Sequence, residues 1–160
     1  ATAFAMAVDA HVSTFLEALG HDGGYIVNPL LPEPLGRRGH HVQECALAAM
    51  ALGHSATPFE LFPQSVALGG AARVVCYGNK DADHNWAIFA NLVANSRGVI
   101  TGEGHHSHHA VAYDHGRIYD PDGREYDYSR KACEVRGFYT QTLWRVARYL
   151  TKDITEGAIL

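Results

Sequence analysis

Residues 108–120 read HHAVAYDHGRIYD, and this stretch carries the clearest β signal in the chain. Two apolar runs flank His115-Gly116, a pair that suits the tight turn of a β-hairpin. The segment therefore predicts two antiparallel strands joined by a tight turn.

The register of this hairpin brings a histidine and a carboxylate together. With a two-residue turn, Val111 lies opposite Asp120, and His109 shares their face of the sheet. The diagonal from His109 to Asp120 spans roughly 7–8 Å between backbones, which the two side chains can bridge with a hydrogen bond. A three-residue turn would instead put His108 on the face of Asp120. The pattern favours a His109–Asp120 pair, with His108 as the alternative.

Upstream of the hairpin, apolar spacing indicates helices. Residues 4–19 show the periodicity of one amphipathic helix, and Gly20 follows as its C-cap. Residues 21–41 form a Pro- and Gly-rich loop, whose length is more typical of a functional loop than of a connector. A short Ala-rich helix is predicted over 44–52.

Four further segments complete the predicted order of elements. The pair Thr57-Pro58 has the pattern of a helix start. Residues 72–77 predict a short buried strand, and residues 86–95 favour a helix over a strand. The apolar spacing over 138–150 predicts a C-terminal helix. Helices first and a small antiparallel sheet later indicate an α+β class and one domain over 1–160.

Composition excludes two classes of partner. The chain has 160 residues, 47% of them hydrophobic, and a formal net charge of −4 with no basic stripe, so nucleic-acid binding is not expected. No apolar run approaches the roughly 18 residues that span a bilayer. The first twenty residues also lack the pattern of a signal peptide, because Asp9 and Glu17 interrupt the apolar part.

The three cysteines, Cys45, Cys76 and Cys133, are odd in number and widely spaced, so they predict neither a disulfide framework nor a CxxC metal site. Cys45 is the candidate nucleophile, because it falls at the start of a predicted helix, where the helix dipole favours a thiolate. The alternative is that Cys45 is a small core residue on the buried face of this helix.

An oxyanion hole and a metal site are two further features that catalysis could need. The Cys45 backbone N–H and the Gln43 side-chain amide are the candidate donors of an oxyanion hole. The histidine-rich run over 105–109 does not predict a metal site, because neighbouring strand residues point to opposite faces and no HExxH motif is present. No metal and no cofactor are therefore expected.

Two motifs resemble those of bacterial papain-fold toxins and effectors. HVQECALAAMAL (41–52) is similar to the segment around their nucleophile, and HHAVAYDHGRIYDPDG (108–123) is similar to their His-led strand and Asp-Pro signature. The resemblance implies a papain-like fold with Cys45 as nucleophile, His109 as base and Asp120 as the carboxylate that orients the base. Gly39 stands where papain itself has its oxyanion-hole Gln, so the likeness is to the toxin branch.

The resemblance also implies an activity. Family members are cysteine-dependent hydrolases that act on proteins, and we expect deamidation of a Gln or Asn side chain of a target-cell protein. Such a protein is secreted or delivered into the cytoplasm of the target cell, as part of a larger parent toxin or with an immunity protein as partner. The alternatives are a papain-like protease, an NlpC/P60-like peptidoglycan amidase, and a non-enzymatic binding or immunity domain.

Overall fold

The computed structural model describes residues 1–33, 36–61, 63, 66–68, 71–73, 82–104 and 108–149. Within these ranges the chain is a mixed α+β protein, as predicted. Its helices are α1 (Thr2–Ala7), α2 (Val12–Leu19), α3 (Val42–Ala51), α4 (Ala82–Ala94) and α5 (Arg130–Val135). Its strands are β1 (His54–Glu60), β2 (Val66–Leu68), β3 (Ala71–Arg73), β4 (Arg97–Glu103), β5 (His108–Asp114), β6 (Arg117–Tyr119), β7 (Glu125–Asp127) and β8 (Tyr139–Arg148).

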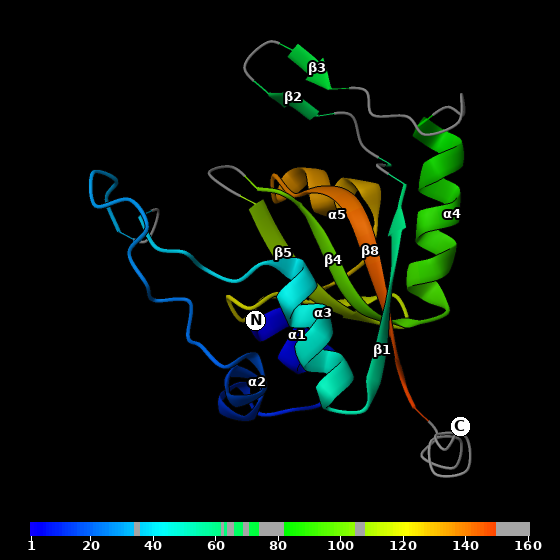
Figure 1. Ribbon diagram of the computed structural model, residues 1–160. Helices are drawn as coiled ribbons and strands as arrows, with labels where there is room; N and C mark the ends of the chain where they lie inside the picture. The colour runs from blue at the N-terminus through cyan, green and yellow to red at the C-terminus, as the bar shows by residue number, and fades with distance from the viewer. Residues whose placement is uncertain are drawn as a thin grey trace, which may run out of the picture.

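Six of the strands form one open antiparallel sheet in the order β1-β8-β4-β5-β6-β7 (Figure 1). Strands β2 and β3 pair with each other as a separate two-stranded ribbon. The main sheet is thus larger than expected. The sequence predicted helices first and strands later, whereas strands and helices alternate along the chain. Strand β8, from the end of the described chain, lies between the edge strand β1 and β4.

Helices cover both faces of this sheet. Val99 and Ile100 are consecutive on β4 and both fully buried, yet they belong to different apolar clusters because successive strand residues point to opposite faces. The cluster with Val99 contains residues of α1, α2 and α3, which lie together on one side of the sheet in Figure 1. The cluster with Ile100 contains Phe89 of α4 and Cys133 of α5.

The hairpin of residues 108–120 forms in the predicted register. Strands β5 and β6 pair Asp114 with Arg117 at the turn and continue two residues further on each strand. His115 and Gly116 have φ values of 45° and 89°, the left-handed backbone that a two-residue hairpin turn requires. The prediction of a turn at these two residues is confirmed.

The N-terminal prediction of one long helix is wrong. The chain breaks between α1 and α2, where Asp9 has a φ of 55°. The break folds the two helices against each other, so that Phe4 and Phe15 stack with ring centroids 6.4 Å apart. Burial of both rings explains why two short helices replace one. The predicted C-cap is correct, since Gly20 ends α2 with a φ of 78°.

Two other predicted helices are strands. The Thr57-Pro58 pair lies in β1, which is an edge strand and pairs with β8 only. A proline lacks the backbone N–H, and sheets tolerate it in an edge strand because no second neighbouring strand needs that donor. The segment predicted as a C-terminal helix forms β8, which pairs along both edges. Leu143 and Val146 are three positions apart and pack on opposite faces of the sheet. In a helix, residues three apart would share one face, which explains why the apolar spacing of this segment predicted a helix.

Two helix predictions agree with the structure, with shifted ends. The Ala-rich helix α3 begins two residues earlier than predicted, and α4 covers most of 86–95 and starts further upstream. Of the predicted strand over 72–77, residues 72 and 73 belong to β3. The remainder of that segment, Cys76 included, lies outside the described residues.

Candidate active site around Cys45 and His109

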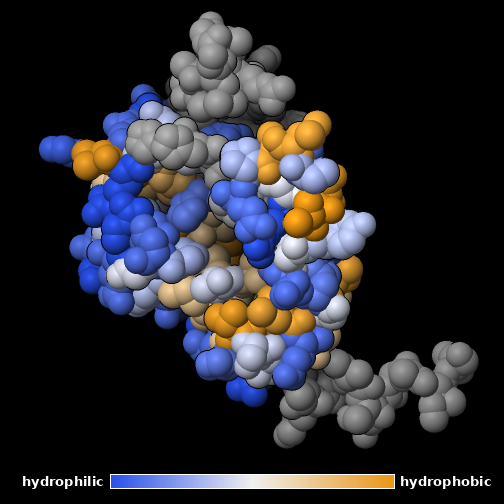
Figure 2. Space-filling view, turned by 90° about the vertical axis from the view of Figure 1, so that its left-hand side faces the viewer, coloured by the Kyte–Doolittle hydropathy of each residue, from blue (hydrophilic) through white to orange (hydrophobic). Residues whose placement is uncertain are grey.

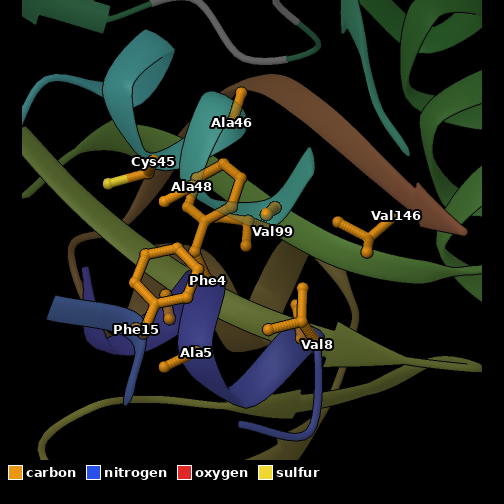
Figure 3. Packing of buried hydrophobic residues seen from close by; sticks show 12 residues of the cluster. Phe4, Ala5, Val8, Phe15, Cys45, Ala46, Ala48, Val99 and Val146 are labelled. Carbon is orange, nitrogen blue, oxygen red and sulfur yellow. The ribbon is translucent and has the colours of Figure 1, made fainter. Parts of the chain in front are cut away.

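Cys45 occupies the fourth position of α3 and is 2% exposed. It packs in the apolar cluster with Phe4 and Ala48, as the core alternative predicted. Figure 3 shows its sulfur at the edge of that cluster, pointing away from the other labelled side chains. Burial raises the pKa of the thiol, which opposes the stabilisation of a thiolate that the start of the helix was expected to give.

The backbone amide of Cys45 is already engaged. It donates to the carbonyl oxygen of His41 at 3.1 Å, because α3 begins at Val42 and the fourth residue completes the first helical hydrogen bond. This contradicts its predicted role as a free oxyanion donor. Gln43 is exposed and does not line the cavity beside Cys45. Residues two apart on a helix point in different directions, which explains why the predicted pair of donors does not converge.

His109 and Asp120 form the predicted contact. His109 Nε2 lies 3.0 Å from Asp120 Oδ1, and the carboxylate is 4% exposed. Asp120 Oδ1 also accepts from the Asp122 backbone N–H at 3.3 Å. The Asp120 carbonyl accepts from Gly123 N–H at 2.9 Å and closes a β-turn. The Asp-Pro-Asp-Gly segment is therefore a turn that also fixes the carboxylate against the histidine.

The His109 ring is held by its neighbours as well. It meets Phe138 edge-to-face, with ring centroids 5.6 Å apart. Gly102 lies opposite His109 on β4, and a Cβ atom built on Gly102 would stand 2.2 Å from the Tyr139 carbonyl oxygen. The glycine therefore lets β8 approach β4 where Phe138 reaches the imidazole. Because Nε2 is bound to Asp120, Nδ1 is the nitrogen left to exchange a proton with a substrate or thiol.

His108 lies on the opposite face of β5. Its side chain is 85% exposed and pairs with Glu103 at 3.2 Å, so it does not share the contact with Asp120. The described residues contain no group of three His, Cys, Asp or Glu side chains arranged to hold a metal. His105 and His106 lie outside the described residues.

Cys45 and His109 line one cavity of about 210 Å³. The first turn of α1 closes one side of this cavity, and Pro121 of the Asp-Pro turn lines another part. The space is smaller than the roughly 300–1,000 Å³ of a pocket for a drug-sized ligand, and it suits a small group such as a single side chain. Two larger cavities, of about 230 and 430 Å³, adjoin the Asp9–Arg97 ion pair and have no cysteine in their walls.

His40 lines the same cavity and was not found from the sequence. Its ring stacks on His21 with centroids 5.1 Å apart, and burial lowers its pKa. Nearby, Arg38 pairs with Glu44 of α3 and lies 2.7 Å from His21 Nε2, which ties the 21–41 loop to the helix of Cys45. The only sequence signal was a histidine just before the helix, which does not reveal its neighbours.

Comparison of the chain with protein-family models, curated proteins and solved structures finds no match to any of them. The fold and the site therefore rest on the geometry described above. Among the described helices, none combines the length and apolarity that crossing a bilayer requires.

Proposed function

We propose that this protein is a cysteine-dependent hydrolase that deamidates a Gln or Asn side chain of a target-cell protein. The observation that carries the proposal is the shared cavity of Cys45 and His109, with His109 held through Nε2 by the buried carboxylate of Asp120. A nucleophile, a base and a group that orients the base are the three parts that this chemistry needs.

The reaction follows from these positions. Cys45 Sγ transfers its proton to His109 Nδ1 and attacks the carboxamide carbon, and the resulting tetrahedral intermediate loses ammonia, which takes the proton from His109. Water then attacks the thioester with His109 as base, so that the side-chain acid forms and the thiol returns. Asp120 keeps the imidazole in the correct tautomer and stabilises its charged form. Burial disfavours a lone thiolate at Cys45. The proposed mechanism therefore requires the imidazolium of His109 to stabilise the thiolate.

A protein substrate is supported by exposed apolar side chains of the 21–41 loop, the loop that precedes α3. Within the 21–41 loop, Tyr25 is 74% exposed and Leu30 is 91% exposed, and His40 near the end of the loop lines the cavity. Figure 2, which views the side from which this loop projects, shows several separate groups of apolar side chains among hydrophilic ones. Exposed apolar groups of this kind are typical of surfaces that bind other proteins. We further propose that the protein is secreted or delivered into the target-cell cytoplasm, with a parent toxin or an immunity protein as partner.

A non-enzymatic binding domain is the second candidate. Two observations favour it: Cys45 is 2% exposed within an apolar cluster, and the pKa of its thiol is raised. In that case Cys45 only packs, and the His109–Asp120 pair only fixes the end of the hairpin.

Alkylation of the native protein separates the two candidates. At about pH 6.5 an ion-paired thiolate still reacts, whereas an ordinary thiol is almost fully protonated. We expect iodoacetamide to modify Cys45 well before Cys133, which is buried and whose pKa is raised to about 12. Equal or absent labelling of the two cysteines would refute the hydrolase.

Activity is then measured on peptides of a casein digest. Deamidation adds about one dalton at a glutamine, whereas proteolysis yields new termini, and Cys45→Ser should abolish either change. Release of fragments from muropeptides would instead support a peptidoglycan amidase.

A further inference from the structure

Small or rigid side chains form the walls of the Cys45 cavity. Ala110 of β5 and Val42 of α3 line it, together with Pro121 and the first residues of α1. Ala110 and Val42 also pack against the apolar cluster that contains Cys45, so both side chains point toward that cluster. The width of the cavity therefore depends on the residues at these two positions.

Neither of these two walls adjusts by changing its rotamer. Alanine has no side-chain rotamers, and the β-branched valine strongly prefers one χ1 rotamer in a helix. Val42 begins α3 three residues before Cys45, and residues three apart share one face of a helix. Ala110 is held by the pairing of β5 with β4, where it lies opposite Thr101. The distance between the two walls is thus set by the backbones of α3 and β5.

The space between these walls suits one narrow group. Its volume of about 210 Å³ corresponds to roughly seven water molecules, and Cys45 is 2% exposed. A primary carboxamide ends a side chain, so it can enter such a cavity from one side. A peptide bond continues as chain on both sides, so its carbonyl carbon would reach the thiol only in a groove that is open at both ends.

We propose that Ala110 and Val42 are specificity-determining residues, which narrow the cavity so that it admits an unbranched side chain with a primary carboxamide and excludes the secondary amide of a peptide bond. This inference rests on the proposed function, because it requires a carboxamide to reach Cys45. It names the residues that separate side-chain deamidation from proteolysis, and neither residue takes part in the chemistry.

The test compares two alkylating probes that carry these two kinds of amide. Iodoacetamide is a primary amide, and iodoacetanilide is the secondary amide with a phenyl ring on the nitrogen. In both cases Cys45 Sγ loses its proton to the buffer and forms a bond to the CH₂ carbon as iodide leaves. Rates of Cys45 modification are measured by mass spectrometry, and each is divided by the rate with N-acetylcysteine. We expect the wild-type protein to prefer iodoacetamide by about tenfold or more, because a packed site discriminates groups of different size by at least this factor.

Two substitutions change the width in opposite directions. Ala110→Leu fills the cavity and should slow the reaction with iodoacetamide about tenfold; Ala110→Val replaces it if the leucine variant is unfolded. Val42→Ala widens the cavity and should lower the preference for the primary amide to less than about threefold. Ala51→Leu is the matched control and should react like the wild type, because Ala51 is an exposed residue of α3 outside this cavity.

Circular dichroism verifies that each variant is folded, and the fully buried Cys133 should react no faster than in the wild type. A wild-type protein that takes both probes equally, or a filled variant at Ala110 that keeps the wild-type rate, would overturn the role of these walls and leave the hydrolase intact. New termini in the casein peptides would also overturn it, because cleavage brings a peptide bond to Cys45. Cys45 that resists both probes would refute the hydrolase, and this inference with it.

Discussion

The contact between His109 and Asp120 makes the sharpest prediction, which is tested by Asp120→Asn. The substitution keeps the shape of the side chain and removes the charge that stabilises a protonated His109. A hydrogen bond to a charged group contributes about 1.5–3 kcal/mol. Because the His109 side chain is 37% exposed, solvent screening favours the lower end, which corresponds to about a tenfold smaller population of the thiolate–imidazolium pair.

The assay is the rate of Cys45 alkylation by iodoacetamide at about pH 6.5, where the ion pair supplies the reactive thiolate. We expect this rate to fall about tenfold in Asp120→Asn. Asp122→Asn is the control, since Asp122 belongs to the same turn but bonds to Arg124 and not to His109. If Asp120→Asn reacts within about twofold of the wild type, the imidazolium does not depend on this carboxylate and the proposed triad is refuted.

The other predictions concern the scaffold that holds the site. Gly102→Ala should cost about 1–3 kcal/mol in urea unfolding, because its Cβ would stand 2.2 Å from the Tyr139 carbonyl oxygen; an unchanged midpoint would contradict that close approach. Leu143→Ala should lower the free energy of unfolding by about 2–5 kcal/mol, whereas Leu47→Ala, at a residue 66% exposed, should change it by less than about 0.5 kcal/mol. Side-chain and backbone hydrogen bonds lower the pKa of Glu44 from 4.5 to about 2, so an unfolded chain takes up this proton at a higher pH than the folded one. The stabilising contribution of the Glu44 carboxylate is complete above about pH 4.5 and is lost towards about pH 2. The fall in Tm between these two pH values should therefore be shallower in Glu44→Gln.

How far the sequence predicts the site can be judged residue by residue. The contact of His109 with Asp120 was predictable because a hairpin turn fixes the register, and the register fixes which side chains share a face. The position of Cys45 in the cavity was not, because α3 reaches the hairpin only through the packing of helices on the sheet. Gln43 is exposed and does not line the cavity, since it lies two positions from Cys45 on α3 and residues two apart on a helix point in different directions.

Taken alone, the sequence determined the local features: the α+β class, the β5–β6 hairpin, helices α3 and α4, and the pairing of a histidine with an aspartate. These depend on turn chemistry and on periodicity over a few residues. Only the tertiary structure decided that 138–150 contains a strand, since pairing with β1 and β4 outweighs the helical spacing of its apolar residues. It alone also placed Cys45, His109 and His40 around one cavity, because contacts between residues far apart in the chain leave no local trace in the sequence.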